Sequence, residues 1–245
     1  MLAAAQLHVK GRHHTLLPPT TLEAHRGEVL LVQADGQHRR TALALALTGR
    51  MRPTSGTVAL GHDDTLGALR RHSAIVDSPE VNEPENHLSV RSLVAEDLAL
   101  VPRKFRDRTR PTAWLVKHGH TGLVSKWVEE LEPATLLGLQ LELALANRDV
   151  ELVVVDSPDR HGADDSPWLA LLHDAAAGRL ARTPGTEPRE LTVVAVVGRV
   201  PPGWDGPTAV VGHEPEWEPG REPDPAPEPE PTTPADPSTE PQVTK

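Results

Sequence analysis

The chain contains no cysteine and no tyrosine, and phenylalanine occurs once among its 245 residues. Without cysteine, disulfides, thiolate catalysis and cysteine-based zinc sites are excluded. Since only five tryptophans are present, the core must rest on leucine, valine and alanine. No stretch approaches the roughly 18 consecutive apolar residues of a membrane span. The N-terminus lacks a basic start followed by a long apolar run, so no signal peptide is expected.

Charge is distributed unevenly along the chain. Residues 214–245 hold nine acidic and two basic side chains, which carry −7 of the net −10, and they include ten prolines. This segment cannot bury enough apolar surface to offset its ordering entropy, and we predict a disordered acidic tail. The remaining net charge of −3 over residues 1–213 is too small to indicate a nucleic-acid partner.

Residues 1–213 alternate between strand-like and helix-like segments, which is typical of an α/β fold with a sheet flanked by helices. The nearly continuous apolar runs at 151–156 and 190–198 predict strands buried on both faces of a parallel sheet. Residues 80–147 are mostly helical in pattern and predict a helical subdomain. Further strands are predicted at 7–9, 27–32, 56–60, 73–77 and 208–212, and helices at 40–51, 88–101 and 125–147.

The segment after the predicted strand 27–32 is a weak match to a phosphate-binding loop. In the pattern G-x-x-x-x-G-K-[ST], backbone N–H groups at a helix N-terminus bind phosphate, the lysine reaches the terminal phosphates and the hydroxyl binds magnesium. Ala34, Arg39, Arg40 and Thr41 stand at the four specified positions. The hydroxyl and a cation are present, but both glycines are replaced, and Gly36 lies inside the loop instead.

Asp156 ends the apolar strand 151–156. A carboxylate at the C-terminal end of a buried parallel strand is well placed to bind magnesium, directly or through water. The alternative is an aspartate that only caps the turn after the strand.

Together these segments resemble the ATP-binding subunit of ABC transporters, over most of residues 1–213. TALALALTGRMRPTSGTVALG (41–61) is the most specific stretch, because the helix ends at a glycine and a PTSG turn leads into a strand, as is typical of the family. LSVRSLVAEDLAL (88–100) is similar to the start of the family's helical subdomain. ELVVVDSP (151–158) looks like its Walker B segment, and ELTVVAVVGR (190–199) looks like the strand before the switch histidine.

The resemblance implies ATP and Mg²⁺ as cofactors of a P-loop NTPase-like fold. Thr41 and Asp156 would hold the magnesium ion. The nucleotide would be bound by Asp35, Gly36, Arg39, Arg40, Thr41 and Ala42.

The chain also departs from the family's pattern. Ser157 stands where the catalytic glutamate is expected, and Gly198 stands where the switch histidine is expected. The position of the Q-loop glutamine falls near Asp77 or Ser78, and no glutamine lies nearby. The signature motif is reduced to EPATLLGLQ (132–140). The aromatic residue that stacks on adenine near the start of the family's sequence has no counterpart, because no aromatic residue precedes Phe105. Because phosphoryl transfer depends on positioned charge, these losses predict weak or no hydrolysis.

Three hypotheses follow from the resemblance. The first is an ATP-binding subunit that associates with a multi-span membrane permease or a second ABC ATPase subunit, at the inner face of the plasma membrane, as a homodimer or a heterodimer. The second is a non-catalytic adaptor that binds such a partner without needing nucleotide. The third is an active ATPase in which Asp159 supplies the missing carboxylate.

Two other clusters have simpler interpretations. The loop after Asp156 carries Asp159, His161, Asp164 and Asp165, which could suggest a metal hydrolase, but a polar loop corresponding to the family's D-loop fits better. The pair His118 and His120 lacks a third ligand at matching spacing and is expected to be a surface feature.

Overall fold

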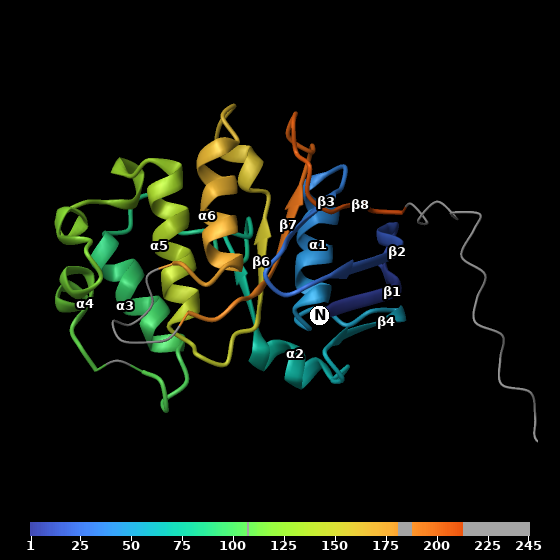
Figure 1. The fold of residues 1–245 in the computed structure, drawn as a ribbon, viewed down its shortest axis with the longest axis horizontal. Coiled ribbons are helices and arrows are strands. Elements are labelled where there is room, and N and C mark those ends of the chain that lie inside the picture. The colour runs from blue at the N-terminus through green and yellow to red at the C-terminus, as the bar shows by residue number, and fades with distance from the viewer. Residues whose placement is uncertain (107, 181–187, 213–245) are drawn as a thin grey trace, which may run out of the picture. The chain divides into compact units, whose positions relative to one another are not determined.

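The computed structural model describes residues 1–106, 108–180 and 188–212, and the predicted acidic tail 214–245 lies outside them. The described residues build two sheets (Figure 1). The antiparallel sheet has the order β2-β1-β4, from β1 (Leu2–Lys10), β2 (Thr15–Ala24) and β4 (Ser55–Leu60). The parallel sheet has the order β5-β6-β7-β3-β8, from β3 (Val29–Gln33), β5 (Ser73–Val76), β6 (Leu152–Asp156), β7 (Thr192–Val197) and β8 (Thr208–Val210).

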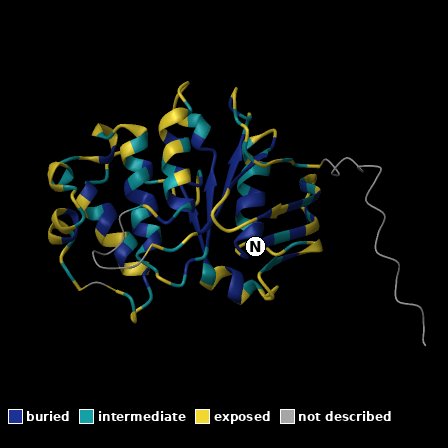
Figure 2. Cartoon of the chain, viewed as in Figure 1, coloured by how far each residue is buried: buried dark blue, intermediate teal, exposed yellow. Residues whose placement is uncertain are grey.

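Helices cover both faces of the parallel sheet. In Figure 1, α1 (Gln37–Leu47) lies between the two sheets, while α5 (Pro133–Leu145) and α6 (Ser166–Ala176) lie on the opposite face of the parallel sheet. Alternate residues of β3 serve the two sides, because Leu30 packs into the core beside α1 and Leu31 into the core beside α5 and α6. The central strands are buried throughout (Figure 2). This burial explains why their sequences are apolar at nearly every position.

A third cluster of buried apolar side chains joins α3 (Val90–Leu100), α4 (Pro111–Lys117), α5 and the 3₁₀ turn Val128–Glu130. Its largest fully buried members are Trp114 and Leu115 of α4 and Leu139 of α5. The extent of a helical subdomain over 80–147 stays a prediction. Within the described part of the chain, no helix combines the length and apolar character that a bilayer-spanning segment requires.

Several elements differ from the sequence prediction. Strand β2 and helices α2 (Leu66–His72), α4 and α6 are absent from that prediction. β2 contains Pro18 and Pro19, which argue against a central strand but are tolerated here because β2 lies at the edge of its sheet. Helix α1 begins at Gln37, three residues before the predicted start, so it includes much of the expected loop.

The carboxyl ends of four parallel strands meet at one edge of the sheet. β3 leads to the loop before α1, β5 to Asp77, β6 ends at Asp156, and β7 leads to Gly198. In open α/β sheets, ligands bind at this edge. The candidate site is therefore located there.

Candidate functional site

The expected phosphate-binding loop is short, because α1 starts directly after Gly36. Gly36 has a positive φ of 79°, which glycine adopts without strain. The backbone amides of Arg39 and Arg40 donate to the Gly36 carbonyl oxygen at 3.1 and 3.4 Å. A phosphate-binding loop needs free N–H groups that point at the anion. These two amides are already used inside the first helical turn.

Asp156 is the centre of a hydrogen-bond network. Its side chain is fully buried. Oδ2 accepts from Thr41 Oγ1 at 2.7 Å and from Ser78 Oγ at 2.8 Å. Oδ1 accepts from Gln37 Nε2 at 3.1 Å and from Ser157 Oγ at 2.7 Å. The structure thus brings Thr41 and Asp156, the two candidate magnesium ligands, into direct contact, and all four acceptor positions of the carboxylate are filled by protein donors.

Arg40 points into this network. Its guanidinium donates from Nε to Ser157 Oγ at 2.7 Å, from Nη1 to the Ala34 carbonyl at 3.0 Å and from Nη2 to Gln37 Oε1 at 2.9 Å. Gly198 makes room for it, since a Cβ added there would lie 3.3 Å from Arg40 Nη1. The cation at the lysine position of the pattern is therefore bound by acceptors of the protein itself.

The other predicted nucleotide-binding residues lie around this network. Asp35 is exposed, and Arg39 is partly buried, with its Nε atom lacking a hydrogen-bond partner among the described residues. Ala42 is buried in the core, at 2% exposure. These side chains make none of the contacts that join Thr41, Arg40 and Asp156.

The positions assigned to hydrolysis hold no free base. Ser157 adopts the left-handed conformation, φ 57° and ψ 50°, and its hydroxyl is held between Arg40 and Asp156. The Asp159 carboxylate, the alternative base, accepts from the backbone amides of Gly198 at 2.9 Å and Arg199 at 3.3 Å. It therefore caps the turn after β7.

A second polar cluster, at the end of β5, involves residues of the loop after Asp156. Asp77 accepts from Arg160 Nη2 on Oδ1 at 2.9 Å and lies 2.7 Å from His161 Nε2 on Oδ2. Its side chain is only 3% exposed. Within the described residues, no three potential ligands gather as a metal site. The interpretation of the loop as the counterpart of the family's D-loop stays a prediction.

Sequence reasoning missed Gln37 and Arg160 as members of the site. It named Ser78 only as a candidate for the Q-loop position and did not predict its contact with Asp156. Gln37 precedes Thr41 by four residues, a spacing that puts both side chains on one face of a helix. That signal was usable only if the helix was known to begin at Gln37. Ser78 and Arg160 follow strand ends, where the pattern does not fix the direction of a side chain.

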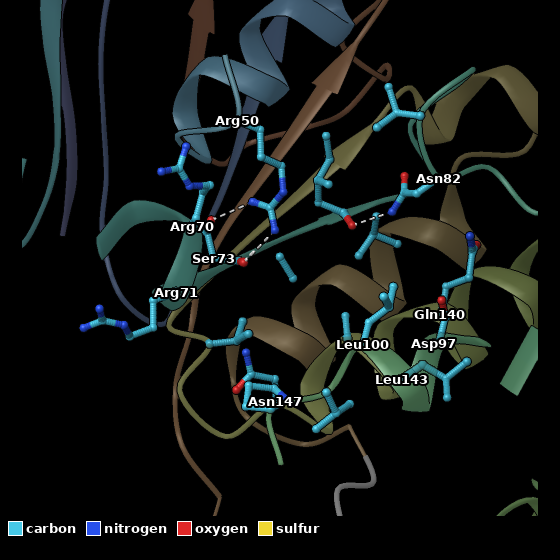
Figure 3. Close-up of a pocket in the computed structure, with 18 residues that line it drawn as sticks. Arg50, Arg70, Arg71, Ser73, Asn82, Asp97, Leu100, Gln140, Leu143 and Asn147 are labelled. Carbon is cyan, nitrogen blue, oxygen red and sulfur yellow. Dashed lines mark hydrogen bonds between the residues drawn. The ribbon is translucent and has the colours of Figure 1, made fainter. Parts of the chain in front are cut away.

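A cavity of about 450 Å³ lies between the α2–β5 region and helices α3 and α5, apart from the Asp156 network (Figure 3). Arg50 crosses one wall and donates to Ser73 Oγ at 3.1 Å. Burial, together with the nearby Arg70, lowers the pKa of Arg50. On the opposite wall, Gln140 is 7% exposed, and its Oε1 has no hydrogen-bond partner among the described residues.

Asp97 of α3 also lines this cavity, and burial, with a smaller effect of Glu96, raises the pKa of its carboxyl to about 6. A pKa raised on folding means that Asp97 stabilises the fold below its unfolded pKa and that this stability is lost as the pH rises through about 6. After a discount for partial exposure, we expect Asp97 to lower the free energy of unfolding of wild type by about 2 kcal/mol between pH 4 and 7. Asp97→Asn should not show this decrease, because an amide does not ionise.

Urea denaturation of wild type and Asp97→Asn across this pH range measures the difference. Exposed Glu129, changed to glutamine, serves as the control and should follow the wild-type profile. Parallel profiles for wild type and Asp97→Asn would show that the carboxyl is not held in its neutral form by the fold.

Comparison with known proteins supports the architecture. No protein-family model matches the chain, and no curated protein matches it. Among solved structures, cbiO1 from Clostridium perfringens, described as part of the ABC transporter complex cbiONQ, superposes with a TM-score of 0.57 at 17% identity, covering 81% of this chain and 78% of that one. A putative ABC transporter ATP-binding protein from Pyrococcus furiosus gives 0.57 at 16%, covering 86% and 96%.

A nucleotide-free ATP-binding cassette from an ABC transporter gives a TM-score of 0.57 at 15% identity, with 81% of each chain covered. The chain therefore has the fold of ABC transporter ATP-binding subunits, and the α/β fold predicted from the sequence is confirmed. At these identities the likeness establishes the fold, while chemistry has to be argued from the site.

Proposed function

We propose that this chain is a non-hydrolysing subunit of an ABC-type transport complex, which works by binding its partner. The single observation that carries the proposal is that Ser157, with its hydroxyl bound by protein groups, stands at the position of the catalytic base. Where the resemblance expects a glutamate to polarise water, Ser157 offers a hydroxyl that is bound to both Arg40 and Asp156. A serine hydroxyl is not a useful base near neutral pH, and a positioned general base typically contributes about 10²–10⁴-fold to the rate.

The surrounding groups support the same proposal. Gly198 has no side chain to replace the switch histidine, and the Asp159 carboxylate is bound by backbone amides. Neither Ser157 nor Asp159 therefore offers a base without protein partners.

The implied Mg-ATP does not fit the site as the structure shows it. Thr41 and Asp156 carry the oxygen atoms that Mg²⁺ prefers. However, the carboxylate of Asp156 already accepts four hydrogen bonds, and Arg40 donates to three protein acceptors. Because these groups are already occupied by one another, the adaptor hypothesis is favoured over the ATP-binding one.

The partner we propose is a multi-span permease or a competent ABC ATPase subunit, at the inner face of the plasma membrane. The support is the fold shared with cbiO1, which is part of an ABC transporter complex. Copurification of the coexpressed chain with a multi-span protein from a neighbouring reading frame would test the association.

Phosphate release from millimolar Mg-ATP tests the absence of hydrolysis. Wild type and Asp159→Asn should both match the buffer rate, because neither position 157 nor position 159 supplies a base. Steady turnover by wild type would overturn the proposal, and its loss in Asp159→Asn would identify that carboxylate as the base of an active ATPase.

A further inference from the structure

We propose that the side-chain amide of Gln37 is an internal ligand that occupies the place of Mg²⁺ and phosphate at the Asp156 network. Gln37 contacts both candidate magnesium ligands, the arginine at the lysine position of the pattern and the serine at the glutamate position. Its Nε2 donates to Thr41 Oγ1 and to Asp156 Oδ1, both at 3.1 Å. Its Oε1 accepts from Arg40 Nη2 at 2.9 Å and lies 3.0 Å from Ser157 Oγ.

The orientation of the amide is dictated by its neighbours. Arginine has only donors and an ionised carboxylate has only acceptors. A flipped amide would place its NH₂ group against the Arg40 guanidinium and its oxygen against Asp156. The hydrogen-bond network therefore assigns Nε2 to the Asp156 side and Oε1 to the Arg40 side.

The two halves of this amide match the two expected ligands in sign. The electropositive NH₂ group meets Thr41 and Asp156, the oxygen-bearing pair that would hold a divalent cation. The electronegative carbonyl meets Arg40, the cation that would hold a phosphate oxygen. Gln37 lies on the first turn of α1, three residues before Arg40 and four before Thr41, so little chain has to be ordered to bring it to these two partners.

Gln37 therefore occupies the groups that would bind the ligands, and its replacement by alanine should free them to bind an anion. This assignment rests on the proposed function and adds to it that wild type also fails to bind nucleotide tightly. A ligand must displace the amide, and its apparent affinity falls by the fraction of molecules that are open. If about 1–10% of molecules are open, Gln37→Ala should bind Mg-ATP about 10–100 times more tightly than wild type.

Calorimetric titration with Mg-ATP, and separately with magnesium-free tripolyphosphate, tests the inference. We compare wild type, Gln37→Ala, and the double variant Gln37→Ala/Arg40→Ala, in which the gain should disappear because the phosphate has lost its cation. His38→Ala, an exposed change on the same helical turn, is the matched control and should behave as wild type. A gain with both probes that Arg40→Ala abolishes would support the inference.

Equal affinity of wild type and a folded Gln37→Ala variant for Mg-ATP would overturn the inference. If Gln37→Ala does not fold, wild type decides: saturable binding well below millimolar Mg-ATP overturns the inference, and its absence supports it. Neither failure bears on hydrolysis, because turnover is measured separately on wild type. Conversely, turnover by wild type would overturn the proposed function, whatever the Gln37→Ala titration shows.

Discussion

Asp156→Ala should lower the free energy of unfolding by about 4 kcal/mol in the absence of any ligand. The substitution removes the common acceptor of Gln37, Thr41, Ser78 and Ser157, of which Ser78 and Ser157 are fully buried. Each buried polar group without a partner costs about 1–3 kcal/mol, reduced where water can enter. Urea denaturation of the purified protein measures the loss.

The matched control is Asp174→Ala, which removes an exposed carboxylate that pairs with Arg179 at 2.8 Å. Exposed pairs contribute about 0–1 kcal/mol, so this variant should remain close to wild type. If Asp156 served only to hold magnesium, its removal would change ligand-free stability little. A loss below about 1 kcal/mol would therefore contradict the structural role of the network.

Under the proposed function, this network would allow the fold to do without a ligand. Binding of a nucleotide stabilises a folded protein through mass action. Here Gln37 and Arg40 supply the donors and acceptors that a ligand would otherwise bring to the strand ends. The altered loop and the missing catalytic glutamate are thus consistent with each other, because Ser157 is a partner in the same network.

The fold was predictable where one physical signal dominated. The apolar runs at 151–156 and 190–198 identified β6 and β7, because a strand buried on both faces needs apolar residues throughout. The signal failed for β2, where Pro18 and Pro19 concealed an edge strand. Helix α4 is only seven residues long and begins with Pro111, which leaves little apolar periodicity to detect.

The site was predictable only to the level of strand ends. Parallel strands bring their carboxyl ends to one edge, so Thr41 and Asp156 could be expected near each other. The contacts of Gln37 depend on the residue at which α1 starts, and helix boundaries are the least certain feature of a sequence pattern. Whether the predicted residues bind nucleotide stays a prediction, which the titrations above address.

Arg160→Ala should lower the free energy of unfolding by about 3 kcal/mol, the second largest effect we expect. Arg160 Nη1 donates to the backbone carbonyls of Asp77 and Asp156, both at 2.8 Å, and Nη2 binds Asp77 Oδ1 at 2.9 Å. It therefore joins the ends of β5 and β6. The Asp77 carboxylate is nearly buried and pairs with Arg160 and His161. Removal of Arg160 leaves His161 as the one that remains of these two partners.

Urea denaturation at pH 7 distinguishes this buried arrangement from an ordinary surface ion pair. Arg179→Ala is the control, since its pair with Asp174 is exposed, and it should cost less than about 1 kcal/mol. Arg160→Lys should fall between Arg160→Ala and wild type, because an ammonium group keeps the charge but cannot span several acceptors as a planar guanidinium does. A similar small loss in Arg160→Ala and Arg179→Ala would mean that β5 and β6 hold Ser78 against Asp156 without this arginine.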